Sequence, residues 1–265
     1  MAKISNKKGL IGFLAIANIV GFIAVLVINY LATSLPIGGM TTGELSDLYP
    51  NLFTPAGITF SIWGLIYLAL TGFVVWQIVD LYKKKSLGIT KKIGIWFLFS
   101  CVINIGWIFA WHYKLVWLSV IIMILFLIVL IVIANKVLIG KKLGNRGDKL
   151  LVQIPFSLYL GWISVATIAN ISTWLVNTGW NMRGMTDIFW TIVVIIVAAL
   201  LALISLYKKY NIIFALVVIW AFIGIIIKRI GVDPVYASSI IWTTGVCIAV
   251  IFGMIGWRLE KWIKN

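Results

Sequence analysis

Stretches of apolar residues long enough to cross a bilayer recur along the whole chain, separated by short segments that hold most of its charged residues. A helix needs about 20 predominantly apolar residues to cross the hydrocarbon core, where its backbone must satisfy its own hydrogen bonds. The pattern predicts helical spans at residues 9–32, 55–82, 93–111, 115–138, 150–176, 187–207, 211–227 and 235–257. The expected fold class is therefore all-α, a polytopic membrane bundle of eight transmembrane helices.

Basic residues are distributed unevenly between the two sides of this predicted bundle. The chain holds 22 Lys and Arg against seven Asp and Glu, a formal charge of +15. Eighteen of these basic residues precede the first span or follow an even-numbered span, and four lie on the opposite side. Because cytoplasmic segments of membrane proteins carry the excess of Lys and Arg, we expect a multi-pass protein of the cell membrane with both termini cytoplasmic. The charge pattern thus reports orientation, and we expect no nucleic-acid partner.

Composition excludes several classes of function. The chain is 63% hydrophobic with a mean hydropathy of +1.11, which leaves no soluble domain. It has one histidine, His112, no phosphate-binding glycine loop and no cluster of acids at metal-ligand spacing, so we predict no catalytic or metal residues. The acids lie in loops or near span ends, which argues against a proton pump. We read His112 as interfacial, and Cys101 and Cys247 as buried thiols.

Residues 48–67 hold the most informative local pattern. Phe60, Trp63 and Tyr67 are spaced three and four apart, which predicts that their rings share one face of a helix. Pro55 suits the first turn of that helix, where its missing N–H costs nothing. The preceding loop, residues 33–54, is long enough to fold over the mouth of a bundle as a lid. The aromatic face is consistent either with tight helix packing or with the wall of a ligand site.

The polar residues expected inside the membrane are neutral amides. Six of them fall within predicted spans: Asn18, Asn29, Gln77, Asn104, Gln153 and Asn170. Amides combined with aromatic faces suit a planar, largely apolar ligand that has a few polar edges. They also suit simple association between helices, since polar side chains commonly form hydrogen bonds across helix interfaces. The residues alone leave both interpretations open.

Three segments carry motifs that matter together. Pro55 is followed by Trp63 and Tyr67 in the second span, and Asn104 is followed by Trp107 in the third. The fifth span holds a proline, a tryptophan, an alanine and an asparagine, namely Pro155, Trp162, Ala166 and Asn170. In this order along the chain, the three segments resemble the second, third and fifth helices of the TspO/MBR family of tryptophan-rich sensory proteins, which are related to the mitochondrial translocator protein. Thr54, Gly57 and Ser61 depart from the family pattern. The sterol-recognition motif is missing after the fifth span, so cholesterol is not an expected ligand.

The resemblance implies a binding protein for a hydrophobic planar ligand, a porphyrin or haem-type tetrapyrrole, that acts in sensing or transport and requires no cofactor. The ligand-binding residues it implies are Pro55, Trp63, Tyr67, Asn104, Trp107, Trp162, Ala166 and Asn170. Two alternatives remain: a light-dependent porphyrin-degrading enzyme, and a permease-like or scaffold subunit. Family members usually have five helices, which predicts a TspO-like bundle at residues 1–180 and an additional three-helix segment at residues 181–265.

One further expectation concerns partners besides the lipid bilayer. Gly106 and Ala110 form a small-xxx-small pair in the third span. Pairs of this kind allow two helices to approach closely. The pair therefore predicts a homodimer.

Overall fold

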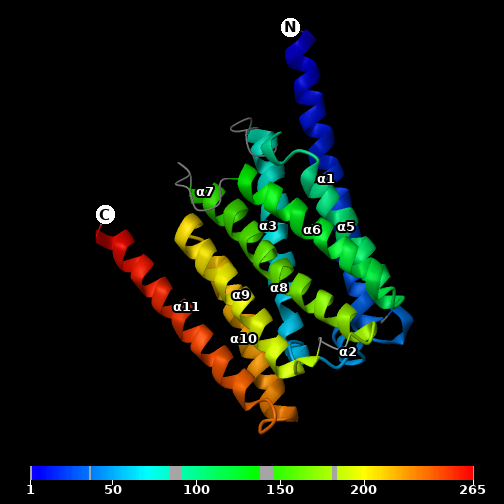
Figure 1. Cartoon of the computed structure of the whole chain (residues 1–265). Helices are drawn as coiled ribbons and strands as arrows, with labels where there is room; N and C mark the ends of the chain where they lie inside the picture. Colours follow the sequence, from blue (N-terminus) through cyan, green and yellow to red (C-terminus); the bar gives the residue numbers. More distant parts are fainter. Residues whose placement is uncertain (1, 36, 84–90, 138–145, 181–183, 265) are drawn as a thin grey trace.

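The chain folds into a bundle of long helices (Figure 1). The structure is a computed structural model, and it describes residues 2–35, 37–83, 91–137, 146–180 and 184–264. These residues contain helices and turns and no strand. The long helices are α1 (Ala2–Ser34), α3 (Ile62–Lys83), α5 (Trp96–His112), α6 (Val116–Lys136), α8 (Ile154–Asn177), α9 (Asp187–Lys209), α10 (Ile212–Val232) and α11 (Ser238–Lys264). The short ones are η1 (Ile37–Gly39), α2 (Thr42–Asp47), η2 (Gly57–Ser61), α7 (Arg146–Asp148) and the π-helical turn η3 (Lys149–Gln153).

The predicted all-α membrane bundle is confirmed. Seven described helical segments are long and apolar enough to cross a membrane, and α5, with 17 residues, is a shorter apolar helix. At 1.5 Å per residue α5 measures about 25 Å, less than the roughly 30 Å of the hydrocarbon core. Residues 91–93 are also helical, but Gly94 has a φ of 55° and separates them from α5. The count of eight spans therefore holds if the interrupted segment 91–112 crosses the membrane as one unit.

The helices form two groups that meet along α10. In the first group α5 packs against α1 and α6, while α8 packs against α3 and α6. In the second group α9, α10 and α11 pack against one another, and α10 also packs against α8 and η2 (Figure 1). A Cβ on Gly161 of α8 would lie 3.0 Å from Val217 Cβ of α10, so the missing side chain allows this close approach. The C-terminal helices are thus packed against the helix that carries Trp162.

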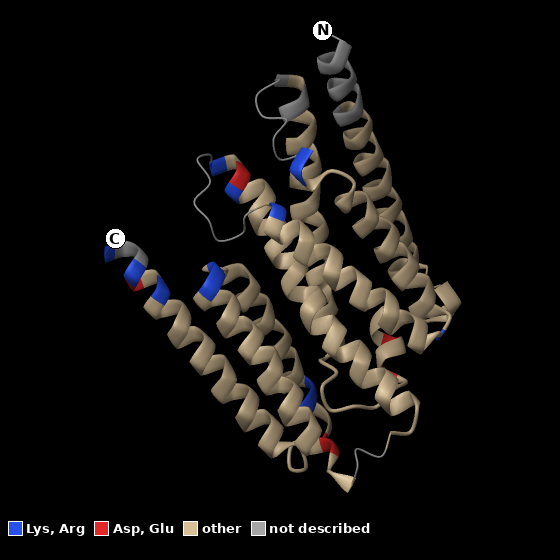
Figure 2. Ribbon diagram, turned by 45° about the horizontal axis from the view of Figure 1, so that its top comes forward, with Lys and Arg blue, Asp and Glu red and all other residues tan. Residues whose placement is uncertain are grey.

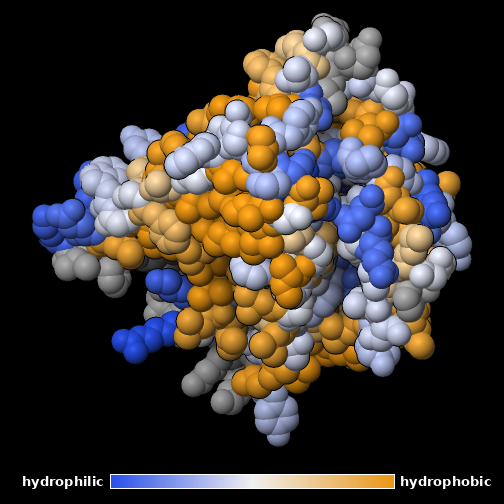
Figure 3. Space-filling view, turned by 90° about the horizontal axis from the view of Figure 1, so that it is seen from below, coloured by the Kyte–Doolittle hydropathy of each residue, from blue (hydrophilic) through white to orange (hydrophobic). Residues whose placement is uncertain are grey.

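The outer surface has the character expected of a membrane protein. Phe13, Ile16 and Val20 of α1 are each more than 60% exposed, and hydrophobic residues cover much of the face in Figure 3. Lys and Arg gather at the end of the bundle where both termini lie (Figures 1 and 2). Termini at one end fit an even number of crossings. The chain is a multi-pass membrane protein.

Two local expectations need correction. No helix begins at Pro55; the 3₁₀ helix η2 begins at Gly57 and α3 at Ile62. The reason is a tertiary contact, because the N–H of Ala56 donates to the carbonyl of Gly224 in α10 at 3.0 Å and residue 56 stays extended. Cys247 is only partly buried on α11, whereas Cys101 is buried as expected.

The predicted dimer pair lies within the bundle. Ala110 is 4% exposed, and the nearest atom to a Cβ built on Gly106 is Ile122 Cδ1 of α6, at 4.0 Å. The small residues therefore assist the packing of α5 against α6 in the same chain. Dimerisation stays a prediction.

Candidate ligand-binding site

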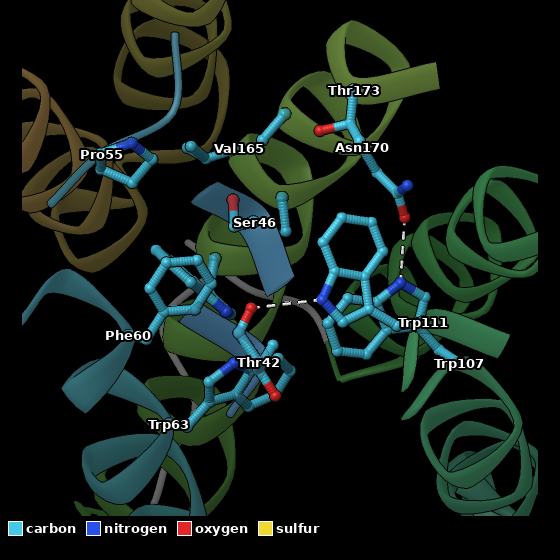
Figure 4. A pocket seen from close by; sticks show the side chains of 13 residues that line it. Thr42, Ser46, Pro55, Phe60, Trp63, Trp107, Trp111, Val165, Asn170 and Thr173 are labelled. Atoms are coloured by element: carbon cyan, nitrogen blue, oxygen red, sulfur yellow. Dashed lines mark hydrogen bonds between the residues drawn. The ribbon is translucent and has the colours of Figure 1, made fainter. Parts of the chain in front are cut away.

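A pocket lies between α2, η2, α3, α5 and α8 (Figure 4). Four tryptophans and one phenylalanine form most of its wall, and small or polar residues complete it. The lining residues are Thr42, Ser46, Pro55, Phe60, Trp63, Trp107, Trp111, Trp162, Val165, Ala166, Ala169, Asn170 and Thr173. The segments that contribute them are far apart in sequence, so the pocket exists only in the folded bundle.

Six of the eight residues implied by the family resemblance line this pocket. They are Pro55, Trp63, Trp107, Trp162, Ala166 and Asn170. Tyr67 and Asn104 do not line it. Sequence reasoning did not single out Thr42, Ser46 or Trp111, although the expected lid, residues 33–54, contains the first two. For Thr42 and Ser46, the sequence feature that could have indicated a place in the pocket is that their loop directly precedes the aromatic helix.

The aromatic side chains pack in a defined order around the pocket. The Trp63 ring stacks on Tyr67, with centroids 5.4 Å apart and planes at 20°. The same ring meets the edge of Trp162 at 6.2 Å and 83°, and Phe60 meets Trp162 at 5.9 Å and 82°. Edge-to-face and offset stacked pairs are the favourable arrangements for aromatic rings. The aromatic side chains Phe60 of η2 and Trp63 of α3 therefore both face Trp162 of α8.

Asn170 holds three helices together at one end of the pocket. Trp107 Nε1 of α5 donates to Asn170 Oδ1 at 2.9 Å (Figure 4), and Asn170 Nδ2 donates to Ser119 Oγ of α6 at 2.9 Å. Both ends of the amide are thus engaged within the protein. Its Oδ1 can still accept one further bond, because an amide oxygen has two lone pairs.

Asn104 is the centre of a second hydrogen-bond network. Its Oδ1 accepts from Asn29 Nδ2 at 2.8 Å. Its Nδ2 lies 3.3 Å from the Tyr67 hydroxyl and 3.2 Å from the Tyr159 hydroxyl. The network links α1, α3, α5 and α8, so Asn104 serves helix association in this structure. Tyr159 was not anticipated, although it precedes Trp162 by three residues and shares its helix face.

The short helix α2 covers the pocket and is fixed at both ends. Thr41 and Glu44 form a capping box, and the backbone and hydroxyl hydrogen bonds from Thr41 hold the pKa of Glu44 below its usual value. Trp111 Nε1 donates to the Thr42 carbonyl at 3.2 Å (Figure 4). At the other end Asp47 forms an ion pair with Lys228 of α10. The helix is therefore tied to both groups of the bundle.

His112 also contributes to the position of the segment that leads into α2. Its Nδ1 lies 2.7 Å from the Ile37 carbonyl, which can only accept, so the proton is on Nδ1. Its Nε2 lies 3.3 Å from the Thr42 hydroxyl. The ring is 4% exposed and both nitrogens are engaged, so His112 has a structural role and holds Ile37 and Thr42 against the end of α5.

The indole N–H of Trp162 is buried and has no hydrogen-bond partner among the residues that the structure describes, whereas those of Trp107 and Trp111 each donate to an oxygen. The Trp162 side chain is 3% exposed. A buried donor without an acceptor costs about 1–3 kcal/mol, so a ligand that brings an acceptor there would recover that cost. Within the described part of the chain, no cluster of three His, Cys, Asp or Glu could hold a metal ion.

The free volume of the pocket is about 40 Å³. One water needs roughly 10–15 Å³ on this scale, so the space fits only a few waters. A tetrapyrrole would require α2 or the aromatic side chains to move outward.

The 55–59 segment of the pocket wall is held by α10. Besides the Ala56 bond to Gly224, Trp220 Nε1 donates to the Thr59 carbonyl at 3.0 Å. Pro55 packs so closely on α10 that a Cβ at position 224 would lie 3.0 Å from it. The C-terminal helices thus support one wall of the pocket directly.

Comparison with known proteins gives one result. The sequence model of a family described as TSPO-like protein matches residues 15–257, which includes the three C-terminal helices. No curated protein and no solved structure matches the chain. The match confirms the resemblance found in the sequence and extends it beyond the fifth span. The chain belongs to the TSPO-like protein family.

Proposed function

We propose that this membrane protein binds a planar hydrophobic ligand of the porphyrin or haem type between α2, α3, α5 and α8, for sensing or transport. The proposal includes an orientation in the cell membrane with both termini in the cytoplasm, supported by the Lys and Arg at that end. The pocket mouth under α2 then lies on the outer side.

The observation that carries the proposal is the unpaired indole N–H of Trp162 within an aromatic wall. The flat faces of Trp63 and Trp107 suit a flat ring system, and the N–H suits an acceptor at its edge. Protoporphyrin has both features, namely a planar macrocycle and carboxylate oxygens. Asn170 Oδ1 offers a second polar contact at the opposite end of the wall.

Entry of such a ligand requires the lid to open. The contacts that hold α2 are one ion pair at the surface and a small number of hydrogen bonds. Exposed ion pairs contribute about 0–1 kcal/mol, and hydrogen bonds about 0.5–1.5 kcal/mol each. Favourable ligand contacts can offset a cost of this size, so α2 is the element that we expect to move.

The test is a titration of the purified full chain with protoporphyrin IX, followed by quenching of tryptophan fluorescence. We expect saturable quenching that is lost in Ala166→Leu, because the added three carbons occupy the pocket beside Trp162. Ala249→Leu is the matched control, since Ala249 is exposed on α11. Equal quenching in both variants, or none in the wild type, would refute the proposal.

A second candidate function is light-dependent breakdown of the bound porphyrin. The observation in its favour is a continuous series of indoles: Trp162, Trp63, Trp107 and Trp111 have successive centroid separations of 6.2, 6.4 and 5.9 Å. Neighbouring indoles at such distances can act as electron donors to an excited ring. Illumination of the complex should then give a new chromophore that a Trp162→Phe variant fails to form; an unchanged porphyrin spectrum would exclude this activity.

A further inference from the structure

A second concave region lies on the outer surface between α9 and α11, far from the tryptophan pocket. It is an open groove of about 710 Å³, and its wall consists mainly of Leu203, Ile204, Val250, Gly253 and Met254. A Cβ on Gly253 would meet no atom within 4 Å, so this position of the groove wall faces open space. On a helix pair that faces lipid, such a groove suits a flexible hydrocarbon chain.

One end of the groove is strongly basic. Tyr207, Lys208 and Trp257 close it there. The guanidinium of Arg258 lies over the Tyr207, Tyr210 and Trp257 rings, with its carbon 5.0, 4.0 and 4.9 Å from their centroids. Lys261 Nζ lies 4.3 Å from the centroid of the Trp257 ring. Figure 2 shows this gathering of Lys and Arg where α9 and α11 end beside one another.

Arg258 is a buried cation without an acidic partner in the described structure. Its side chain is 5% exposed, it donates to the Tyr207 carbonyl, and its Nε has no hydrogen-bond partner among the described residues. The ion pairs found in the same residues all involve other cations. A buried charge is costly unless a counter-charge and further hydrogen bonds accompany it. The site therefore favours an anion.

We propose that the groove between α9 and α11 binds an anionic phospholipid from the surrounding bilayer. The phosphate lies at Lys208 and Arg258, and one acyl chain follows the apolar wall past Gly253. The argument rests on complementarity of charge, because an apolar channel that ends at Lys208, with Arg258 against the rings of Tyr207 and Trp257, matches a molecule with a hydrocarbon chain and a phosphate. Basic pockets between transmembrane helices at the Lys-rich side of the membrane bind lipid headgroups in this way.

The dimensions agree with one acyl chain. Val250 and Trp257 are seven residues apart on α11, which corresponds to about 10 Å along the helix axis. This length accommodates the part of an acyl chain nearest the headgroup. The rest of the chain would remain in the bilayer, which suits a groove that is open to the surface.

The experiment uses the full chain in detergent, supplied with equal amounts of phosphatidylglycerol and phosphatidylcholine, and counts retained lipids by native mass spectrometry. We expect one phosphatidylglycerol to be retained over phosphatidylcholine by about 25-fold, since each of the two basic residues at the headgroup contributes about five-fold and the factors multiply. Gly253→Leu should abolish the retention by filling the groove. Gly245→Leu is the matched control, because a Cβ there also meets no atom within 4 Å and residue 245 is not part of the groove wall.

A separate variant tests the contribution of the basic residues to lipid preference. Lys208→Gln alters an exposed side chain and should reduce the preference for phosphatidylglycerol by about five-fold without affecting the fold. Equal retention of the two lipids by the wild type would overturn the proposal, and so would a Gly253→Leu variant that retains lipid as the wild type does. A change of oligomeric state in Gly253→Leu with no change in lipid retention would also overturn it, since the groove would then be a contact between copies of the chain.

Discussion

Replacing Gly224 by alanine should separate α10 from the pocket wall. A Cβ at this position would lie 2.0 Å from Thr59 Oγ1 and 2.9 Å from Thr59 Cγ2, and Pro55 Cβ is 3.0 Å away. These distances are shorter than real carbon contacts, so either α10 or the 55–59 segment must shift. A shift would also weaken the hydrogen bond from Ala56 to the residue 224 carbonyl.

The expected cost follows from three contributions. Overpacking of a dense interior costs about 1–3 kcal/mol. Weakening the hydrogen bond adds up to about 1.5 kcal/mol. The exchange of glycine for alanine inside a helix returns about 1 kcal/mol. We expect Gly224→Ala to lower the free energy of unfolding by about 2 kcal/mol, near the middle of the span of these contributions.

The assay is reversible unfolding in mixed detergent micelles, followed by circular dichroism, with Gly231→Ala as the control. Gly231 lies on the same helix, and a Cβ there meets no atom within 4 Å, so the control should be neutral or slightly stabilised. Thr59→Ala should restore much of the stability lost in Gly224→Ala, because it removes both Thr59 atoms that the new methyl meets. Equal stability of the two glycine variants, or no coupling between positions 224 and 59, would refute the assigned role of α10.

Three other predictions concern the Asn104 hydrogen-bond network, the helix α2 as a lid, and the turn between α10 and α11. Asn104→Leu removes three interhelical bonds worth about 0.6 kcal/mol each and should lower the free energy of unfolding in the same assay by about 2 kcal/mol; an unchanged value would show that the network is dispensable. Lys228→Met frees Asp47 and should accelerate porphyrin association in stopped-flow fluorescence while the free energy of unfolding changes by less than about 1 kcal/mol; an unchanged association rate would argue against α2 as the lid. The Tyr236 hydroxyl donates to Asp187, which raises the pKa of Tyr236, so this contact should hold below the usual phenol pKa and be lost as the pH rises through the raised value. An alkaline titration of tyrosinate absorbance should therefore lose a late-titrating group in Tyr236→Phe, and an identical curve would contradict the contact.

The spans were predictable because hydrophobic length alone identifies a membrane helix. The residues at which helices begin and end were less predictable, as the start of α3 shows. Pro55 is a good first-turn residue by local rules, but the Ala56 bond to Gly224 keeps the chain extended there. A contact between residues 168 positions apart cannot be read from local sequence.

The sequence predicted which residues of the candidate site share one face of a helix, but it did not predict which residues of other helices they contact. The spacing of Trp162, Ala166 and Asn170 indicated one stripe, and all three line the pocket. Spacing does not reveal what lies opposite, so nothing in the sequence showed that Asn104 would be engaged by Asn29 and two tyrosines. Asn104 therefore stands outside the pocket wall, although the family resemblance implied a contact with the ligand.

The packing of the last three helices was the part least open to prediction. Their apolar sequences defined three spans, but the ion pair between Lys228 and Asp47 and the bond from Trp220 to Thr59 became visible only in the fold. Arg258 looked like an ordinary basic residue at a span end. Its burial among three aromatic rings depends on the way α9 and α11 pack together.

The most direct test of the account is the dissociation constant of protoporphyrin IX for Trp162→Phe beside that of the wild type. Phenylalanine keeps an aromatic ring in the wall but removes the indole N–H, whose hydrogen bond is worth about 0.5–1.5 kcal/mol. The account predicts binding weaker by roughly 2- to 12-fold, with no loss in the free energy of unfolding because an unpaired donor has been removed. An affinity equal to or tighter than that of the wild type would contradict a ligand bound against Trp162.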